Sequence, residues 1–287
     1  MKKFKLKSFC KINLTLRVIK KMQNGYHNIQ SLVTFCNLYD SITISNTNHL
    51  HDKIFFSGKF KNGISKKSNT ITKLLYLLRK KNFLKKQAFK INIKKNIPHG
   101  SGLGGGSSNA ATLLNFFNSK MHLRLNKNQI YKISNQIGSD TPINLYKKNT
   151  LVTGKKGKLL RFNNKLGLDI LIIYPNIVCS TKKIYEKNKK FSPRESQINF
   201  NTKNKKKLIT YLINENNDLE STVIKYYPKI KKVINFIKSQ NGCIFSRITG
   251  SGSACIGIFS SKKNAIYAKK LIKLKYPKYW SVISKTI

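Results

Sequence analysis

A glycine-rich segment near the middle of the chain has the composition of a phosphate-binding loop. It reads PHGSGLGGGSSNAATLL from Pro98, with five glycines between Gly100 and Gly106. Glycine lets backbone N–H groups turn toward an anion at close range. The serines that follow open a run with apolar residues at helical spacing, and a helix N-terminus offers unpaired N–H donors and a positive dipole end. The segment therefore predicts a phosphate site.

Carboxylates that could act as a base beside bound phosphate are few, because the chain has 57 Lys and Arg residues against 9 Asp and Glu. Asp140 stands in Gly138-Ser139-Asp140-Thr141-Pro142. These residues also make a good helix start, with a capping side chain and a proline in the first turn. From the residues alone, capping is the stronger interpretation of Asp140, and a general base is the alternative.

Cysteines and histidines give no pattern of a metal centre or a disulfide framework. The five cysteines are scattered without a C-x-x-C pair, which is typical of reduced thiols. His49 and His51 flank Leu50 in the polar stretch NTNHLHDK, where a solvated loop is a better interpretation than a chelating pair. We expect no metal held by such clusters.

The formal net charge of +48 raises the question of a nucleic-acid partner. Lysines occur throughout the chain, without a basic tail or an interleaved aromatic platform. This distribution favours compositional bias over a binding footprint, so no specific nucleic acid is expected. The N-terminus alternates lysines with apolar residues and lacks the continuous apolar core of a secretory signal, and no apolar run is long enough to span a membrane. A cytoplasmic protein without a membrane partner is expected.

The elements that must position these residues alternate between strand and helix patterns. Apolar and polar residues alternate over 9–19, which predicts a half-buried strand with Lys11 and Asn13 on its polar face. Helices are predicted over 68–82, 107–121, 126–138, 217–227, 229–242 and 262–276. Strands are predicted over 41–46, 53–60, 88–98, 151–162 and 169–175, with a strand–loop–strand unit over 245–259 and a last strand after it. A polar stretch over 182–206 is interpreted as a mobile connection.

This alternation predicts an α+β protein of two domains. We place the boundary near residue 160, with an N-terminal nucleotide domain over 1–160 and a C-terminal substrate-side domain over 161–287.

Common phosphate loops do not fit the glycine segment. Gly100-x-Gly102-x-x-Gly105 satisfies the dinucleotide spacing, but the strand before it carries lysines on one face and no acidic residue follows at the required distance. No Gly-Lys-Ser/Thr follows, which excludes a Walker A loop. The protein-kinase companions V-A-I-K and H-R-D are missing.

The segment from Pro98 to Ala111 instead resembles the ATP loop of the GHMP kinases (galacto-, homoserine, mevalonate and phosphomevalonate kinases). Three further stretches agree in order and spacing: Lys11-Ile-Asn-Leu with Gly25-Tyr-His, Gly138-Ser-Asp-Thr-Pro, and Thr249-Gly-Ser-Gly-Ser-Ala-Cys. The resemblance implies a ribosomal-protein-S5-domain-2-like N-terminal domain and a ferredoxin-like C-terminal domain. The chain departs from the family pattern at Asn24, Asn28, His99, Ser101, Ser139 and Thr141, which bears on substrate affinity more than on the type of reaction.

The resemblance also implies an activity. Lys-Ile-Asn-Leu followed by Gly-Tyr-His points to the family branch with a cytidyl substrate. ATP with Mg²⁺ would phosphorylate the tertiary 2-hydroxyl of 4-diphosphocytidyl-2-C-methyl-D-erythritol, an intermediate of non-mevalonate isoprenoid synthesis. Asp140 would accept the hydroxyl proton, and Lys11 would keep that carboxylate ionised and stabilise the transferring phosphoryl group. A monomer or a homodimer would suffice.

Further site residues follow from the same resemblance. The predicted ATP-binding residues are Asn69, Lys95, Pro98, His99, Gly100, Ser101, Gly102, Leu103, Gly104, Gly105, Gly106, Ser107 and Ser108, with Ser107 or Ser108 as a possible Mg²⁺ contact. The predicted substrate-binding residues are Asn13, Tyr26, His27, Tyr185, Gly250 and Gly252, with Ser253 beside them.

Plainer interpretations stay open for several of these residues. Asn69 could be a helix cap and Lys95 a solvated lysine. The second glycine loop, which contains Gly250, Gly252 and Ser253, could be a tight turn. Two other functions also compete with the predicted one. They are a GHMP kinase for another alcohol, such as homoserine or mevalonate, and a non-catalytic protein that binds nucleic acid through its charge.

Overall fold

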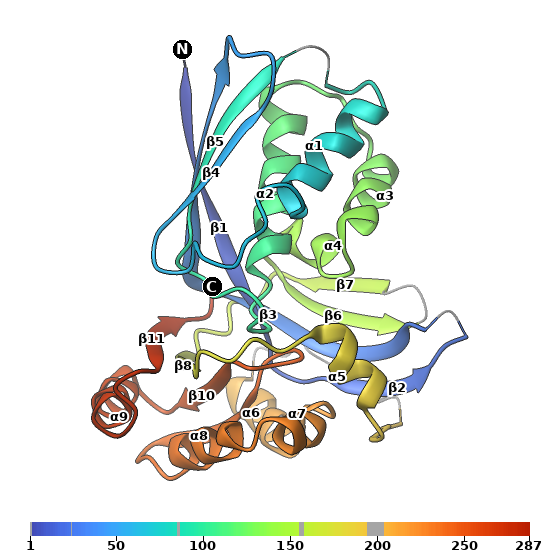
Figure 1. Cartoon of the computed structure of the whole chain (residues 1–287). Helices are drawn as coiled ribbons and strands as arrows, with labels where there is room; N and C mark the ends of the chain where they lie inside the picture. The colour runs from blue at the N-terminus through green and yellow to red at the C-terminus, as the bar shows by residue number, and fades with distance from the viewer. Residues whose placement is uncertain (1, 24, 85–86, 155–157, 194–203) are drawn as a thin grey trace. The chain divides into compact units, whose positions relative to one another are not determined.

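The computed structural model describes all residues except 1, 24, 85–86, 155–157 and 194–203 (Figure 1). The chain forms two compact units that interleave along the sequence. The first unit comprises Met1–Lys11, Leu38–His99 and Gly104–Lys147, and the second comprises Ile12–Asn37, Gly100–Leu103 and Lys148–Ile287. Helix and strand are mixed in both, as expected for an α+β protein.

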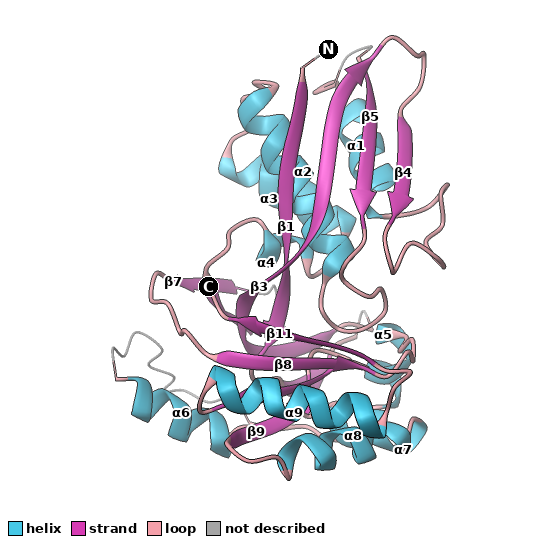
Figure 2. Ribbon diagram, turned by 90° about the vertical axis from the view of Figure 1, so that its left-hand side faces the viewer, coloured by secondary structure: helices cyan, strands magenta, loops and turns pink. Residues whose placement is uncertain are grey.

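The first unit is a sheet with helices on one face (Figures 1 and 2). Its strands are β1 (Lys3–Asn13) as far as Lys11, the C-terminal half of β3 (His27–Thr47), β4 (Lys53–Ser57) and β5 (Ala88–Lys94). β5 pairs antiparallel with β3 and parallel with β4, while β1 pairs with β3. The helices are α1 (Thr70–Lys80), α2 (Gly105–Lys120), α3 (Lys127–Ile137) and the short α4 (Thr141–Asn144).

The core of this unit forms where the apolar faces of the helices meet the sheet. Fully buried members include Ile42, Leu74, Phe89 and Phe117, and the rings of Phe89 and Phe117 meet edge to face at 5.0 Å. Burying one such side chain contributes roughly 1.5–3 kcal/mol. This core fixes the start of α2, which is also the end of the glycine segment.

The second unit contains two groups of strands. In one, the N-terminal half of β3 pairs with β2 (Arg17–Lys21) and with β6 (Asn149–Gly154), which in turn pairs with β7 (Lys158–Phe162). In the other, β8 (Asp169–Tyr174), β9 (Cys243–Ile248), β10 (Cys255–Phe259) and β11 (Trp280–Lys285) form an antiparallel sheet in the order β11-β8-β10-β9.

The helices of the second unit are α5 (Thr181–Lys187), α6 (Lys205–Asn214), α7 (Glu220–Tyr226), α8 (Lys229–Lys238) and α9 (Lys262–Lys275). α8 and α9 pack on the β11-β8-β10-β9 sheet through Val233, Ile237 and Ala268, all buried (Figure 2). The chain order β8, α8, β9, β10, α9, β11 is the split β-α-β arrangement of ferredoxin-like folds, as expected. The domain boundary near residue 160 stays a prediction.

Most predicted elements are confirmed within a few residues, and four are corrected. The single strand expected over 151–162 is instead two strands, β6 and β7, which pair antiparallel with each other. The strand expected over 9–19 is interrupted between β1 and β2, and its polar side is buried rather than solvated, since Lys11, Asn13 and Thr15 are at most 5 % exposed. The stretch 182–206, expected to be a mobile connection, contains most of α5 and the start of α6, while its residues 194–203 lie outside the described part. Helix α2 begins two residues earlier than expected, inside the glycines.

Across the residues that the structure describes, we find no helix whose length and apolar character would let it cross a membrane.

Candidate functional site

The glycine segment leads into an open helix N-terminus in the first unit. Gly104 occupies the N-cap position of α2 with a left-handed backbone (φ +68°), which glycine adopts at no steric cost. With hydrogen for a side chain, it caps none of the first N–H groups of the helix. The first backbone hydrogen bond of the helix is donated by the Ser108 N–H to the Gly104 carbonyl, at 2.9 Å. The first turn of α2 therefore presents N–H donors for an anion.

Lys11 and Asp140 meet beside this helix start. The Lys11 ammonium lies 3.3 Å from Asp140 Oδ2, and the two side chains are 4 % and 39 % exposed. The Lys11 stem passes over Gly104 so closely that a Cβ there would lie 2.7 Å from Lys11 Cγ. The two predicted catalytic residues and the end of the glycine segment thus lie together within one compact unit.

Asp140 does hold the N-cap position of α4, but its carboxylate makes no capping hydrogen bond within the described residues. The capping function that the sequence favoured is therefore wrong for this side chain. The α4 start is held instead by Pro142 in the first turn and by the Asn144 amide, which donates to the Asp140 carbonyl at 2.7 Å. The carboxylate is left facing Lys11.

Ser107 and Ser108, which the sequence could not separate, have different surroundings. The Ser108 hydroxyl is buried, accepts a hydrogen bond from Ser8 at 2.9 Å and donates to the Phe9 carbonyl at 2.6 Å. Ser107 is partly exposed in the first turn of α2. Ser108 therefore ties α2 to β1, and Ser107 is the better placed of the two for a ligand.

The first part of the glycine segment, Gly100–Leu103, belongs to the second unit and packs on the second glycine loop. The Ser101 carbonyl accepts from Ala254 N–H at 3.0 Å, and a Cβ at Gly102 would lie 2.1 Å from the Thr249 carbonyl oxygen. Gly102 (φ +81°) is therefore required by this close approach. The second glycine loop is therefore more than a tight turn, because it contacts the Gly100–Leu103 part of the glycine segment and limits its shape.

That second loop is held from several sides within the unit. The Asn217 amide donates to the Gly250 carbonyl at 2.8 Å, and the buried Ser253 hydroxyl donates to the Ile177 carbonyl. Gly252 lies against Val223, because a Cβ added at Gly252 would lie 3.2 Å from Val223 Cγ1. These contacts make Gly250–Ser253 a rigid element.

Asn13 is tied to the same loop. Its backbone N–H donates to Thr249 Oγ1 at 2.9 Å, and its side-chain amide donates to the Ser31 hydroxyl at 2.8 Å. Two residues earlier on β1, Lys11 leaves the strand on the same side by the alternation of side chains.

Three of the predicted substrate-binding residues, Tyr26, His27 and Tyr185, belong to the second unit. The rings of His27 and Tyr185 lie 5.1 Å apart and inclined by 40°, with Tyr185 on α5. Tyr26 is 67 % exposed. Burial, and then the charge of Lys21, lower the pKa of His27, which favours the neutral imidazole. His27 Nε2 is buried with no hydrogen-bond partner among the described residues, as expected of a group that awaits a polar ligand.

The side chains of Asn69 and Lys95 both have polar partners within the first unit. Asn69 caps α1: its Oδ1 accepts from the Ile71 and Thr72 N–H groups at 2.9 and 3.1 Å. Lys95, expected to be a solvated lysine if not a ligand, is buried and forms an ion pair with Asp40. Both lie next to the helix start, because Thr70 donates to the Gly106 carbonyl at 2.8 Å and a Cβ at Gly105 would lie 3.3 Å from the Lys95 ammonium.

The remaining predicted loop residues are packed or shielded. Pro98, Ser101 and Leu103 are buried, and the His99 imidazole lies against Gly63, where a Cβ would be 2.8 Å from Nε2. These residues shape the loop.

Sequence reasoning assigned no role to Asp40, Thr70 and Asn217, although all three hold the glycine loops. Their partners Lys95, Gly106 and Gly250 lie 55, 36 and 33 residues away in the chain. No local pattern signals such distant contacts.

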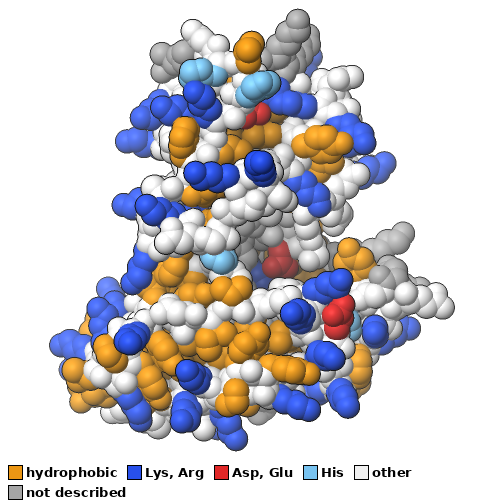
Figure 3. All heavy atoms as spheres, viewed as in Figure 1, with side chains coloured by type: hydrophobic (Ala, Val, Ile, Leu, Met, Phe, Trp, Pro, Cys, Tyr) orange, Lys and Arg blue, Asp and Glu red, His pale blue; other side chains and the backbone are white. Residues whose placement is uncertain are grey.

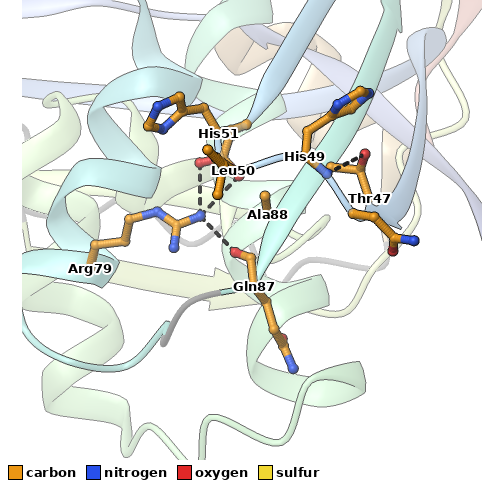
Figure 4. A pocket seen from close by; sticks show the side chains of 9 residues that line it. Thr47, His49, Leu50, His51, Arg79, Gln87 and Ala88 are labelled. Atoms are coloured by element: carbon orange, nitrogen blue, oxygen red, sulfur yellow. Dashed lines mark hydrogen bonds and ion pairs between the residues drawn. The ribbon is translucent and has the colours of Figure 1, made fainter.

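A cavity of about 550 Å³ in the first unit is lined by other residues, Thr47–Asp52, Arg79, Gln87 and Ala88. Figure 4 shows the Arg79 guanidinium donating to the Gln87 carbonyl, a bond of 2.8 Å. His49 and His51 are exposed as expected for a loop, and the Lys53 ammonium lies 3.1 Å from His49 Nε2. Over the described ranges, no three His, Cys, Asp or Glu side chains gather as a metal centre would require.

The cysteines are free thiols, as predicted. Burial raises the pKa of Cys179 and of Cys243 to about 11, so both are protonated near neutral pH and are poor nucleophiles.

Lysine and arginine side chains are dispersed over the face shown in Figure 3, interleaved with apolar and uncharged ones. This pattern resembles the even spread of lysines along the chain.

Two family models match the chain. The GHMP kinases N terminal domain matches residues 69–148, which include the glycine segment and Asp140, and the GHMP kinases C terminal model matches residues 204–273. The chain is 42 % identical over its full length, and the full length of the relative, to the 4-diphosphocytidyl-2-C-methyl-D-erythritol kinase of Pelagibacter ubique. It is 34 % identical to the kinase of the same name from Caldicellulosiruptor bescii, with 94 % of each chain covered.

Solved structures share the fold. A 4-(cytidine 5'-diphospho)-2C-methyl-D-erythritol kinase superposes with a TM-score of 0.77 at 20 % identity, covering 98 % of this chain and 99 % of the other. The homoserine kinase of Cytophaga hutchinsonii gives a TM-score of 0.66 at 16 % identity, covering 100 % and 95 %. From the family models and the full-length relatives, the chain belongs to the GHMP kinase family.

Proposed function

We propose that the protein phosphorylates the 2-hydroxyl of 4-diphosphocytidyl-2-C-methyl-D-erythritol with ATP, in the supply of isoprenoid precursors. Kinases of this family use ATP as the phosphate donor, and the two relatives described above carry the name of this activity. The observation that carries the proposal is the Lys11–Asp140 pair, at 3.3 Å, whose lysine stem lies over Gly104.

Each residue of that pair has a task in the reaction. Asp140, the more exposed partner, accepts the proton of the attacking hydroxyl. The Lys11 ammonium keeps the carboxylate ionised and stabilises negative charge on the transferring phosphoryl group. The N–H groups of the first α2 turn hold the triphosphate, since a helix N-terminus favours anions.

The donor set fits a magnesium ion that arrives with the nucleotide. Mg²⁺ usually keeps several waters and binds substrate phosphates, and here the partly exposed Ser107 hydroxyl would contact it. When bound, it would neutralise charge on the phosphates.

The cytidyl base is assigned to Tyr26, His27 and Tyr185. The exposed Tyr26 ring supplies a stacking face, and base–aromatic stacking is worth on the order of 1–3 kcal/mol in single-stranded nucleic-acid sites. The lowered pKa of His27 favours the neutral imidazole, and its buried Nε2, which has no partner among the described residues, can hydrogen-bond a base. Since a tertiary alcohol is hindered, we expect positioning by these residues and Asn13 to matter as much as base strength.

The second glycine loop and the two residues beside the nucleotide loop support the site indirectly. Gly250 and Gly252 let the loop shape Gly100–Leu103 from within the second unit. Asn69 fixes the α1 start from which Thr70 braces Gly106, and Lys95 lies beneath Gly105. Both act on the nucleotide through the backbone of the loop.

A coupled assay with the purified chain, ATP and Mg²⁺ tests the proposal. We expect ADP formation that depends on the cytidyl alcohol and is not supported by homoserine or mevalonate. Turnover with one of those alcohols instead would identify a different GHMP kinase. Tight duplex DNA binding with a steep salt slope, and no substrate-dependent turnover, would favour a nucleic-acid-binding protein.

A further inference from the structure

Asp40 lies at the centre of a buried polar cluster directly beneath the glycine segment. It is 0 % exposed and follows the middle of β3. Its Oδ1 accepts from the N–H groups of Asn96 and Ile97 at 2.8 and 2.9 Å. Its Oδ2 accepts from the Asn109 amide at 3.0 Å and from the Lys95 ammonium. All of these residues belong to the first unit.

The positions of these donors along the chain are informative. Asn96 and Ile97 immediately precede Pro98, where the glycine segment begins, and Asn109 stands one turn inside α2. One carboxylate therefore binds both flanks of the segment. The same cluster contacts the helix start directly, because a Cβ at Gly105 would meet Ile97 Cγ2 at 2.9 Å and the Lys95 ammonium at 3.3 Å.

We propose that Asp40 is a positioning residue for nucleotide binding, which holds the two flanks of the glycine segment together and so presets the N–H groups of α2. Five glycines lose much backbone entropy on ordering, and a segment ordered before the ligand arrives leaves less of this cost to the binding step. The inference rests on the nucleotide role proposed above for this segment.

Lys95 makes this arrangement compatible with an anionic ligand. A bare carboxylate under a helix N-terminus would repel a triphosphate, and an isolated charge at a fully buried position is costly. The Lys95 ammonium cancels the charge of Asp40 while the carboxylate oxygens keep their geometry toward the backbone. The pair thus acts as a neutral clamp.

The test measures binding of a non-hydrolysable ATP analogue with Mg²⁺, which does not depend on the identity of the phosphate acceptor. Asp40→Asn places an amide opposite the Lys95 and Asn109 donors, and we expect the dissociation constant for the analogue to rise at least tenfold. The Michaelis constant for the cytidyl alcohol should stay within twofold, a split that a general loss of structure would not produce.

Asp52 offers a matched control in the same unit. Its carboxylate also binds a cation and a backbone amide, accepting from Arg79 Nη2 and from the Phe89 N–H at 2.9 Å, but it does not lie on the glycine segment. We expect Asp52→Asn to change the dissociation constant for the analogue less than twofold. An Asp40→Asn protein that melts earlier but binds the analogue like the wild type, or that weakens both ligands alike, overturns the inference.

Three further variants extend the test, and the first of them keeps it decisive if Asp40→Asn does not fold. Asn109→Ala removes the link from Asp40 to α2 without stranding a charge, and we expect at least a threefold rise in the dissociation constant. Lys95→Met should also weaken binding, and the double variant Asp40→Asn/Lys95→Met should bind no worse than the weaker single, because both changes break one clamp. Unchanged binding in Asn109→Ala, or multiplied effects in the double variant, overturns the inference. A wild type that binds no nucleotide overturns the proposed function and this inference with it.

Discussion

Helices α1 and α2 pack side by side in the same unit, yet their N-termini are built in opposite ways (Figures 1 and 2). The α1 start is closed by a complete capping box: Asn69 accepts from the first-turn amides, and the Thr72 hydroxyl accepts from the Asn69 N–H at 2.9 Å. The α2 start has only Gly104 at the same position. Both helices pack in the same unit, so the difference between their N-termini comes from the residue at the N-cap position, Asn69 in α1 and Gly104 in α2.

Under the proposed function, the difference separates a helix start that only stabilises the fold from one that binds the nucleotide. A cap such as Asn69 contributes about 1 kcal/mol to stability. At α2 the chain gives up that contribution and keeps its N–H donors and dipole available. The comparison teaches that a missing cap, next to a paired lysine and carboxylate, is itself a sign of an anion site.

The comparison between the two helix starts is wrong if the uncapped start of α2 does not lie beside the residues that catalyse phosphoryl transfer. Asp140→Asn removes the proposed base but keeps the shape of the side chain, and we expect kcat to fall by roughly 10²–10⁴-fold. Nucleotide affinity should stay within about twofold, since the N–H groups of α2 are untouched. Single-turnover kinetics and direct nucleotide binding measure the two quantities. Asp52→Asn, which removes another paired carboxylate of the unit, should retain full turnover, and near-normal kcat in Asp140→Asn would refute the assigned base.

A methyl group at Gly104 should have the next largest effect. Gly104→Ala forces a left-handed backbone on alanine, at a cost of about 1–2 kcal/mol, and its Cβ meets the Lys11 stem at 2.7 Å. Displacing Lys11 by about 1 Å should lower kcat by roughly tenfold to 100-fold.

Gly154→Ala is the matched control for that change. Gly154 has a similar φ of +82°, but a Cβ there would meet no atom of the described residues within 4 Å. It should lose the same stability in a denaturant titration and keep its kcat. Equal losses of activity in the two variants would show that strain, and not the position of Lys11, matters.

Much of the open end could be predicted from sequence because its signals are local. The glycines, the Ser-Ser-Asn-Ala-Ala run and the Gly138 stop of α3 lie within a few residues of the features that they produce. The pairing of Lys11 with Asp140, 129 positions apart by their numbers, came only through the family resemblance.

The rest could not be predicted because it depends on tertiary contacts. The first half of β3 is buried on both sides with polar residues such as Gln30, Ser31 and Thr34 inside, so it has no alternating pattern to find. Asp40 has no neighbours in sequence that announce its ion pair with Lys95. For Asp140, local capping propensity favoured the wrong interpretation, because the carboxylate is paired with Lys11 and makes no capping hydrogen bond within the described residues.

Gly106→Ala sharpens the comparison, because stability and affinity should move in opposite directions. Gly106 has no left-handed backbone, and among the described residues a Cβ there would meet only Thr70, at an ordinary 3.5 Å. The fold does not require a glycine, and alanine should stabilise the helix by about 0.5–1 kcal/mol. The new methyl group should crowd bound phosphate and raise the Michaelis constant for ATP roughly tenfold, equivalent to about 1.4 kcal/mol. A higher melting temperature with an unchanged Michaelis constant would mean that phosphate does not approach here.

The smallest expected effect comes from the closed end, where Asn69→Ala has a matched partner in Asn126→Ala. Asn126 caps α3 with the same capping box, accepting from Gln129 N–H at 2.9 Å. Each variant should lose about 1 kcal/mol of unfolding free energy. Only Asn69→Ala should alter the Michaelis constant for ATP, by about twofold. The reason is that Thr70, at the α1 start, is connected to the Gly106 carbonyl by one hydrogen bond, which is worth about 0.5–1.5 kcal/mol. A tenfold rise in Asn69→Ala alone would mean that the Asn69 side chain contacts the nucleotide directly, and the α1 start would then be part of the site rather than its closed counterpart.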